Sequence, residues 1–411
     1  MEMMLGFAFV CLLLPSFGLS GRTNLTIDIE DMEIERQLKL LNKPAIKTIV
    51  EENGDIFDCV DINKQLAFDH PSLKDHKIQL RPSSFPDELF DHISSLTNAT
   101  SIEIGLKNGN VCPSGTVPIR RVSKDDLIRM RSSNLKQKKK MMHSPYNTNL
   151  QSGHGHTWAV HRTPHDPNDP DLYKYFGASA FLNIYALPRF QSTQFSSGLI
   201  WLVNELNSNQ VNQIAAGWTV DPTTYGDSQT RLSTAWTVDN FMNTGCQDAR
   251  CPGFVHVSTR IPLGTTFSPL STYNGPQYGL FIVIYRDPVT LNWWLILGPD
   301  KEPIGYWPTK LFTNLADHAN RVDFGGTAGN DDGFDMPPMG NGHFPNEGYS
   351  RTGCFEVLKF IDSNVKSRDV LYQDVFPLYP SQCYNLGDIT ATRGDQGTMF
   401  LYGGPGGSQG C

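Results

Sequence analysis

The sequence predicts a mainly β protein, an antiparallel sandwich or barrel that follows a small α+β unit. From about residue 153 to 411, short β-prone runs are separated by Gly, Pro, Asn and Asp. The chain has 36 Gly and 27 Pro, 11% aromatic residues and only 18% charged residues. This composition is typical of a turn-rich sheet protein rather than a helical bundle or a disordered chain. No βαβ rhythm and no internal repeat is visible, which argues against a parallel sheet.

Residues 1–20 have the features of a secretory signal. The apolar run from Met3 to Pro15 is too short to cross a bilayer, and the small residues Gly18 and Ser20 follow it where a signal peptidase would cut. A basic start is missing; the alternative is a buried core segment. No later stretch is long and apolar enough to span a membrane. We therefore expect a soluble, secreted protein.

The cysteines are consistent with an oxidising compartment. Of the eight, Cys11 lies in the signal, and seven remain. An odd number leaves one unpaired or intermolecular, and disulfides are the default outside the cytosol. No Cys-x-x-Cys pair occurs and no zinc spacing is recognisable, so we expect no metal site and no cofactor.

Residues 21–121 are predicted to form the α+β unit. Residues 27–42 have apolar positions near helical spacing. Two β-prone runs around Asn53-Gly54 predict a hairpin, residues 76–86 a strand, and residues 111–121 a turn that leads into a strand. Cys59 can pair with Cys112 inside this unit. Glycosylation sequons begin at Asn24 and Asn98.

Residues 122–150 differ from both neighbours. The stretch from Arg120 to Lys140 contains nine basic and two acidic residues, and the region has few bulky apolar residues. It is predicted to be a processing linker, with Lys138-Lys139-Lys140 as a protease target; a solvated helix is the alternative. From residue 151 onward the chain has 15 basic and 23 acidic residues, so we expect no nucleic-acid partner and no anionic membrane.

In residues 151–411, eight strands are predicted by β-propensity or alternation: 156–162, 179–187, 196–203, 213–220, 231–238, 253–260, 278–287 and 292–298. One modest helix is expected from Trp307 to Arg321. Cys246 and Cys251 are spaced to close a tight hairpin end, and Cys383 with Cys411 would hold the last strand.

Several motifs together resemble the plant neprosin family. In the first part they are NKPAIKTIVEENGDIFDCVDI, AFDHPSLKDHKIQ and CPSGTVPIRR, which are similar to the family's activation peptide. In the second part they are YFGASAFLNIY, AAGWTVDPTTYGDSQTRLSTAWT, TGC, STYNGPQY, NWWLILG, IGYWP, GNGHFPNEGY and YGGPG. The resemblance covers nearly all of the chain after the signal. It implies a prosegment and a β-sandwich of two antiparallel sheets, secreted to the apoplast or the vacuole, and its disulfides match the cysteine pairs above.

The resemblance also implies a glutamic endopeptidase that cuts beside proline in acid. Two glutamates would act as a pair: one stays ionised as the base that activates a water, and the other donates a proton. Two carboxylates held close together push their pKa values apart, which makes this division possible.

Both family glutamate positions are substituted in this chain. The first precedes Ala-Gly-Trp and is Ala215 here; the second follows Phe324-Gly325-Gly326 and is Thr327. Asp323 is the possible residual acid. General acid–base groups contribute about 10²–10⁴-fold each, so losing the base should leave activity near background.

Other acids and side chains are weaker candidates. A carboxylate from a nearby turn could substitute for the missing pair, and the possible residues are Asp221, Asp227, Asp239 (which could instead pair with Arg231) and Glu347. His154 and His156 share a strand face, with His161 and His165 following, but a zinc site is the less favoured interpretation. Cys354 could act with His343 as a nucleophile; a simple unpaired thiol is favoured because nothing near it would lower its pKa. No G-x-S-x-G motif lies in the strand–turn–helix setting that a serine hydrolase would require.

The aromatic residues could select proline. We expect Trp218, Tyr225, Trp236 and Tyr306 to line a substrate cleft, although most of the aromatic set, which also includes Tyr273, Trp293, Trp294 and Trp307, should be core. Two functions remain open. The first is a monomeric, catalytically impaired protein that binds proline-rich peptides or wall proteins. The second is an active proline-directed acid endopeptidase with a pair rebuilt from Asp323 and another acid. A third possibility is a purely structural role, which predicts that the protein has no cleft.

Overall fold

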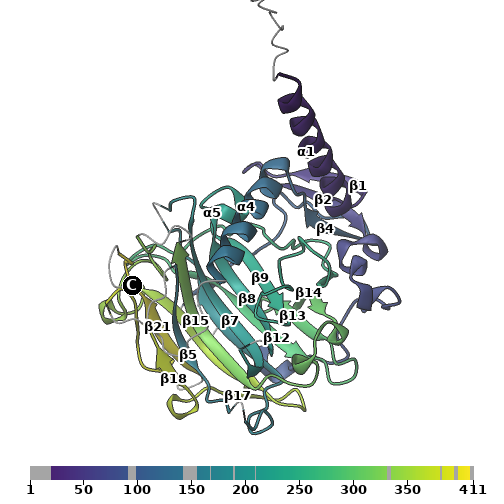
Figure 1. The fold of residues 1–411 in the computed structure, drawn as a ribbon. Coiled ribbons are helices and arrows are strands. Elements are labelled where there is room, and N and C mark those ends of the chain that lie inside the picture. Colours follow the sequence, from purple (N-terminus) through teal and green to yellow (C-terminus); the bar gives the residue numbers. More distant parts are fainter. Residues whose placement is uncertain are drawn as a thin grey trace, which may run out of the picture.

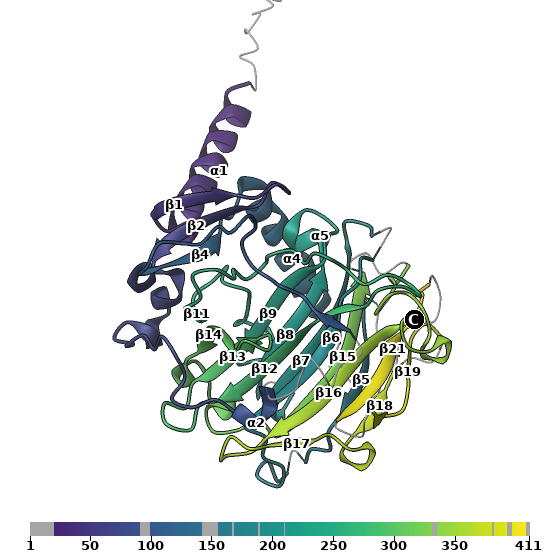
Figure 2. The same ribbon diagram turned by 180° about the vertical axis from the view of Figure 1, so that it is seen from behind.

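A computed structural model describes residues 20–90, 99–141, 155–166, 168–187, 190–208, 210–330, 335–379, 382–392 and 397–407. Within them the strands form a three-stranded, a seven-stranded and an eleven-stranded sheet, and the two large sheets pack face to face (Figures 1 and 2). All pairings in the seven-stranded sheet are antiparallel. The predicted mainly β, antiparallel architecture is confirmed. The signal at residues 1–20 lies outside the described residues except for Ser20.

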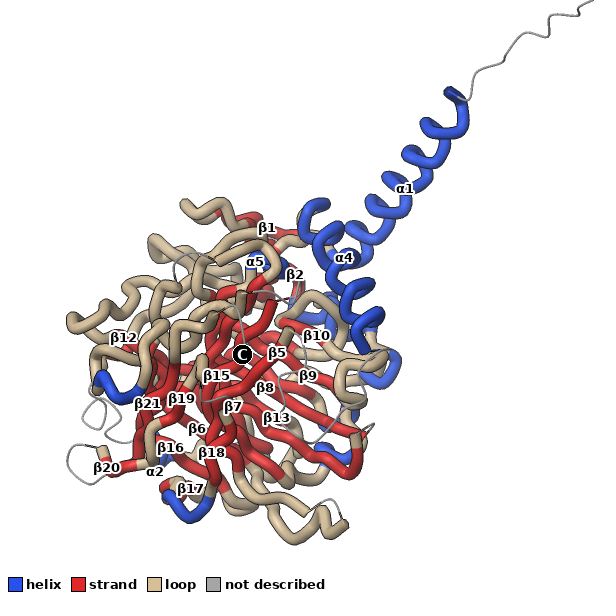
Figure 3. The backbone as a smooth tube through the Cα atoms, turned by 60° about the vertical axis from the view of Figure 1, so that its left-hand side comes forward, coloured by secondary structure: helices blue, strands red, loops and turns tan. Residues whose placement is uncertain are grey.

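Residues 21–121, hereafter the N-terminal unit, begin with helix α1 (Ser20–Leu41), which projects from the molecule (Figure 3). Strands β1 (Ala45–Val50), β2 (Ile56–Asp61) and β4 (Thr116–Arg120) form the small sheet in the order β1-β2-β4. The predicted helix and the hairpin at Asn53-Gly54 are confirmed; Gly54 has φ +88°, which a side chain disfavours. The strand predicted at 76–86 is wrong, because this segment bonds to the side chains of Tyr306 and Asp287 instead of pairing its backbone with a neighbouring strand.

The described residues of the N-terminal unit also contain several short elements. They are the 3₁₀ turns η1 (Ile62–Lys64), η2 (Leu66–Asp69) and η3 (Pro71–Leu73), helix α2 (Asp87–Phe90) and strand β3 (Thr100–Ser101). Asn98 lies outside the described residues, and the side chain of Asn24 in α1 is not described.

The predicted linker begins as helix α4 (Lys124–Met141), so this stretch is helical, and its role in processing stays a prediction. The hydroxyl of Ser123 caps the first turn by accepting a hydrogen bond from the N–H of Asp126 at 3.0 Å, and Asp126 accepts one in return from the N–H of Ser123 at 2.9 Å. The helix packs beside α1 and the short helix α5 (Pro222–Tyr225) (Figure 1). Residues 142–154 lie outside the described part of the chain.

The seven-stranded sheet has the order β10-β9-β8-β7-β15-β5-β18. Its strands are β5 (His156–Arg162), β7 (Gln194–Asn207), β8 (Gln210–Val220), β9 (Arg231–Thr237), β10 (Cys246–Gln247), β15 (Arg321–Asn330) and β18 (Phe376–Leu378). The strands predicted at 156–162, 196–203, 213–220 and 231–238 are thereby confirmed. The sequence patterns did not reveal β15, whose glycines mask its β-propensity.

The eleven-stranded sheet has the main order β11-β14-β13-β12-β6-β16-β21-β19, with β3, β17 and β20 added at its margins. Its remaining strands are β6 (Gly177–Asn183), β11 (Val255–His256), β12 (Tyr278–Arg286), β13 (Trp293–Leu297), β14 (Glu302–Trp307), β16 (Gly353–Ile361), β17 (Ser367–Asp369), β19 (Asn385–Leu386), β20 (Thr390–Ala391) and β21 (Thr398–Gly403). Strands β12 and β13 confirm the predictions at 278–287 and 292–298, and β6 confirms the first part of 179–187. Of the strand predicted at 253–260, only Val255–His256 is a strand. Residues 155–411 are hereafter the body.

The helix expected from Trp307 to Arg321 is wrong. The segment contains only the 3₁₀ turns η4 (Thr309–Leu311) and η5 (Asn314–Ala316). The side-chain oxygen of Asn212 accepts hydrogen bonds from the backbone N–H groups of Thr313 and Asn314 at 2.9 and 3.0 Å, and these bonds hold the chain as a loop over β8. Two further turns are η6 (Pro345–Glu347) and η7 (Tyr372–Asp374).

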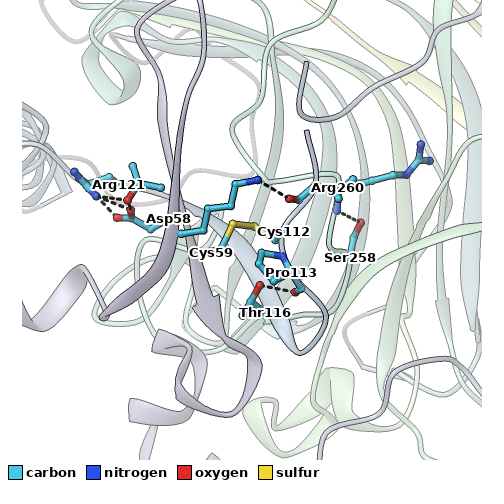
Figure 4. Close-up of a disulfide and its surroundings, with 11 residues drawn as sticks. Asp58, Cys59, Cys112, Pro113, Thr116, Arg121, Ser258 and Arg260 are labelled. Atoms are coloured by element: carbon cyan, nitrogen blue, oxygen red, sulfur yellow. Dashed lines mark hydrogen bonds and ion pairs between the residues drawn. A yellow bond between two sulfur atoms is a disulfide. The ribbon is translucent and has the colours of Figure 1, made fainter. Parts of the chain in front are cut away.

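The main core lies between the two large sheets. Alternation along each strand sends every second side chain into it, for example Ile200, Ile214, Trp218 and Phe324. Cys59–Cys112 and Cys246–Cys251 are disulfides, as expected, and the first is shown in Figure 4. Cys383 is also disulfide-bonded, and its expected partner Cys411 lies outside the described residues. Among the described helices, none has the length and hydropathy that a membrane span requires.

Candidate functional site

Both family glutamate positions lie on the outer face of the seven-stranded sheet, the face that points away from the main core. On β15, Val322, Phe324 and Ala328 point into the core. Alternation therefore sends Asp323 and Thr327 to the outer face. On β8 the same reasoning places Ala215 outward, because Ile214 and Ala216 belong to the core.

Strand register places these positions in different rows. Ala215 on β8 is opposite Trp201 on β7, and Trp201 is opposite Asp323 on β15. Thr327 lies four residues further along β15, about 13 Å at the rise of a strand. It is opposite Ser197 on β7. The short side chains of Ala215 and Thr327 therefore do not meet, and Asp323 is the polar residue that shares the row of Ala215.

The row between them has little side-chain cover. Leu199 on β7 is opposite Gly217 on β8 and Gly325 on β15. A Cβ on Gly217 would lie 2.0 Å from the carbonyl oxygen of Gly198, and one on Gly325 would lie 2.2 Å from that of Ala159. Glycine is therefore required at both positions, and Leu199 remains only partly buried between them.

Ala215 lies in an apolar cluster on this face. The side chain is 1% exposed and packs in a cluster with Val160, Trp201, Val203 and Val211. An alanine methyl group has no proton to give or accept. The first family position therefore contributes packing and no acid–base chemistry.

Asp323 is held in an ion-pair network. Both of its carboxylate oxygens accept hydrogen bonds from Arg162, from Nε at 2.9 Å and from Nη2 at 2.8 Å. Arg321 Nε lies 3.5 Å from Asp323 and its Nη1 pairs with Glu205. His165 Nε2 is 3.9 Å from Glu205. The carboxylates of Asp323 and Glu205 are thus separated by guanidinium groups and do not form a pair around a water.

Thr327 belongs to a line of hydroxyl groups. Its Oγ1 donates to the carbonyl of Thr157 at 2.9 Å. In the same row, the hydroxyls of Ser197 and Thr219 are 2.7 Å apart. Thr219 is opposite Arg231 on β9, so the row runs from Thr327 to a buried arginine. These three hydroxyl groups are buried and already hydrogen-bonded, and at ordinary pH they do not ionise.

The acids that could have replaced the missing pair have other roles. Asp221 caps α5 through the N–H of Thr224 at 3.0 Å. Asp227 pairs with Arg231 at 2.6 Å. Arg231 is the residue that the sequence suggests as a partner for Asp239. Asp239 instead accepts hydrogen bonds from the loop at Asn243 and Thr244.

Glu347 takes part in a separate surface cluster. It is bound by His343 Nδ1 at 2.9 Å and receives a hydrogen bond from Tyr273 at 2.9 Å. It is therefore no partner for Asp323, whose ion-pair partners are Arg162 and Arg321.

The expectation that four aromatic residues line a cleft is corrected by their burial. Trp218 and Trp236 point into the main core, and Tyr306 lies in a second core on the outer face of the other sheet. Tyr225 is buried under the arginines 120, 231 and 250, whose guanidinium carbons lie 5.7, 5.1 and 4.6 Å from its ring centre. Trp293, Trp294 and Trp307 are also core, as expected for most of the set. Tyr273 is exposed.

The sequence patterns missed the aromatic residue that this face does present. Trp158 on β5 is opposite Thr327, and 38% of its surface is exposed. The alternation of the stretch HTWAVHR contains the signal, since Ala159 is in the core and its neighbours therefore point outward. Trp201, in the row of Ala215, and Phe195, beside His156, are further aromatic residues on this face.

The remaining candidates do not form a reactive centre. His161 is buried and Nε2 lies 2.9 Å from the carbonyl oxygen of Gly387. Within the described residues no three His, Cys, Asp or Glu side chains are placed to hold a metal, and His154 lies outside them. Cys354 is free and buried, and burial, with Glu356 nearby, raises the pKa of its thiol well above the ordinary value. His343 is bound to Glu347, not to Cys354.

Two solved peptidase structures are similar to part of this chain. Scytalido-glutamic peptidase, solved with a transition state analog inhibitor, is 12% identical; the match covers 60% of this chain and 97% of that one, with a TM-score of 0.31. SCP-B of the Eqolisin family, solved with the tripeptide Ala-Ile-His, is 11% identical over 61% of this chain and 97% of that one, with a TM-score of 0.29.

The family models match in two stretches. The Neprosin activation peptide model matches residues 48–162, which reaches the end of β5. The Neprosin model matches residues 192–405, more than half of the chain. This protein therefore belongs to the Neprosin family.

Proposed function

We propose that this protein is a secreted binding protein of the Neprosin family that holds proline-rich peptides, or wall proteins that contain them, without cutting them. The observation that carries the proposal is Ala215, an apolar residue at the position where a carboxyl group would be needed. The disulfides and the disulfide-bonded Cys383 support an oxidising destination such as the apoplast or vacuole.

Hydrolysis by this type of site needs two carboxyl groups that share one water. One must accept a proton from the water and the other must donate one to the carbonyl or the leaving amine. Ala215 can do neither, and Thr327 donates its hydroxyl to Thr157. Losing a general base costs about 10²–10⁴-fold in rate, so the turnover of a peptide bond should fall to background.

The outer face retains groups that suit an extended peptide. Trp158 offers an exposed indole on which a pyrrolidine ring can stack, and Thr327 lies directly opposite it. Beyond Thr327, Ser197 and Thr219 form the buried floor of the row with their hydroxyls bonded to each other, and the partly exposed Leu199 lies in the neighbouring row between two glycines. A proline-rich segment in its extended form loses little entropy on binding to such a surface.

An active endopeptidase with a rebuilt pair is the second candidate. One observation favours it: Asp323 shares the row of Ala215, and Glu205 is linked to Asp323 through Arg321. Against it, Arg162 holds both oxygens of Asp323, so a water would have to displace a bidentate ion pair.

The experiment compares binding and cleavage on the same protein. The full chain, intact and after cleavage in the linker, is incubated at pH 4–7 with a labelled proline-rich peptide, and binding is followed by fluorescence anisotropy and cleavage by mass spectrometry. We expect binding without cleavage, weakened about tenfold by Trp158→Ala. The matched control is Val289→Ala, an exposed apolar residue beyond β12, which should bind like the wild type.

Cleavage by the wild type would refute the binding function. If Asp323→Asn then abolished that cleavage, Asp323 would belong to a rebuilt pair. Absence of both binding and cleavage would leave the structural role as the function.

A further inference from the structure

The N-terminal unit supplies part of the hydrophobic core of the body. Its residue Leu73 is fully buried in the main core, together with Ile102 and Ile104. The hydrophobic core of a domain is usually built from that domain's own side chains. We propose that the N-terminal unit is a permanent subunit: cleavage in the linker yields a two-chain protein and does not release a free body.

The second core makes this dependence larger. It lies on the outer face of the eleven-stranded sheet and consists of apolar body residues, among them Phe181, Phe281, Val283, Tyr285, Trp294, Ile296 and Tyr306. Residues of the N-terminal unit cover it, namely Ala67, Leu89, Phe90 and Ala99. The rings of Phe90 and Phe281 meet edge to face at 5.7 Å.

Losing that cover would expose a continuous apolar surface. Tyr285, Trp294 and Tyr306 are each 0% exposed in the intact chain. Soluble monomers rarely expose contiguous apolar patches larger than a few hundred Å². The body therefore needs something on this face, and the occupant that the structure shows is its own N-terminal unit.

Backbone pairing joins the two parts as well. Strand β3 runs parallel to β12, with Thr100 opposite Tyr278. The N–H of Thr100 donates to the carbonyl of Gln277 at 2.9 Å, and that of Ile102 donates to Gly279 at 3.0 Å. The unit thus extends the hydrogen-bonding of a body strand, the way an added strand binds a sheet.

Buried polar groups across the boundary are paired. The side chain of Gln65 accepts from the N–H of His256 at 2.8 Å and donates to its carbonyl at 3.1 Å. The hydroxyl of Tyr306 lies 2.8 Å from His76 Nε2 and accepts from the N–H of Gln79 at 3.0 Å. Removing the unit would leave these groups without partners in a dry environment, which is costly.

The disulfide loop of the unit lies against the body loop at Ser258 and Arg260 (Figure 4). The N–H of Cys112 donates to the carbonyl of Thr259 at 2.9 Å. Cys59 and Cys112 both belong to the unit, while Cys246 and Cys251 both belong to the body. Neither of these disulfides crosses the boundary, so the association that we infer rests on packing and hydrogen bonds.

The test uses the full chain cut in the linker. A specific protease site is introduced within residues 142–150, or trypsin is used briefly at Lys138–Lys140. The product is analysed by size-exclusion chromatography at neutral pH and by gel electrophoresis without reductant. We expect two pieces on the denaturing gel that co-elute at the volume of the intact chain and unfold in one thermal transition.

Release of the unit would overturn the proposal. The proposal would be wrong if the body eluted without the unit, either as a folded monomer, as a self-associated form or bound to another protein. A pair of variants tests the packing argument. Phe90→Ala should raise the dissociation constant of the two pieces about 100-fold. Leu80→Ala, an exposed residue of the same unit, should leave it unchanged. Equal constants for the two variants would contradict the role of the second core.

Discussion

Asp55 and Arg231, 176 residues apart in the chain, form a buried ion pair in which Nη1 donates to Oδ2 at 2.6 Å. Asp55 comes from the β1–β2 hairpin and Arg231 from the start of β9. The guanidinium is 0% exposed and is also held by Asp227 and by the carbonyl of Gly264. The N-terminal unit therefore supplies one of the charges that make this arginine tolerable inside the protein.

Replacing this carboxylate should destabilise the whole chain. Asp55→Asn leaves Arg231 and Arg120 short of one negative charge in a buried place, and breaking such a pair costs about 3–5 kcal/mol. The loss is measured by urea unfolding at pH 7. Asp171→Asn, which removes an exposed ion pair with Lys174, is the control and should have no measurable effect. Equal stability of Asp55→Asn and the wild type would contradict the buried pair.

Stability should fall as the pH drops from about 6.5 to about 4. Burial lowers the pKa of His256 from 6.5 to about 4, so the unfolded chain takes up a proton in this range while the folded protein does not. The stability from His256 is therefore full above pH 6.5 and is lost on the way down to pH 4, by about 3 kcal/mol. The unfolding midpoint should depend less steeply on pH across this range in His256→Gln than in the wild type. An unchanged pH dependence in His256→Gln would mean that other groups cause the loss of stability.

A second loss of stability should follow at lower pH. Burial alone would raise the pKa of Asp55, but Arg231 and Arg120 bring that pKa below its ordinary value of 3.8. A carboxylate with a depressed pKa stabilises the fold above its unfolded pKa and loses this contribution as the pH falls through the folded one. Below about pH 4 the Asp55→Asn variant should therefore become less sensitive to acid than the wild type.

Restoring both family glutamates should create peptidase activity. Ala215→Glu with Thr327→Glu is expected to cut a proline-rich peptide in acid, because two glutamate side chains can extend toward one water over the row of Leu199, which the shorter alanine and threonine side chains do not cross, whereas the wild type and each single variant remain near background. Burial near Val160 and Trp201 should raise the pKa of a glutamate at 215, which suits a proton donor. Cleavage products are quantified by mass spectrometry, with circular dichroism to confirm folding. A folded but silent double variant would mean that more than the pair has been lost.

Cys354 should not react in the folded protein. Its side chain is 1% exposed and burial raises the pKa of its thiol, so little thiolate is available to reagents. Titration with a thiol reagent at pH 8 is expected to show labelling of this residue only in denaturant. Fast labelling of the native chain, mapped to Cys354 by peptide mass, would contradict its buried position.

Local sequence patterns were enough to predict several strands, the N-terminal hairpin and the chemistry that is missing. Alternation predicted β5, β7, β8 and β9, and the Asn53-Gly54 pair predicted the hairpin, because these signals depend on neighbours a few residues apart. The substitutions at Ala215 and Thr327 are likewise visible in the sequence, since an absent carboxyl group needs no fold to be recognised. Cys354 was favoured as the unpaired cysteine, and it is the free cysteine among the described residues.

Only the tertiary structure decided which side chains share a surface. Strand β15 is rich in glycine and owes its conformation to pairing with β5 and β7. A shift of one residue exchanges the two faces of a strand, so Trp218 is core while Trp158 is exposed. The contacts of Leu73, Phe90 and Asp55 with the body join residues far apart in sequence. Such pairings depend on the register and packing of whole sheets, which local patterns do not encode.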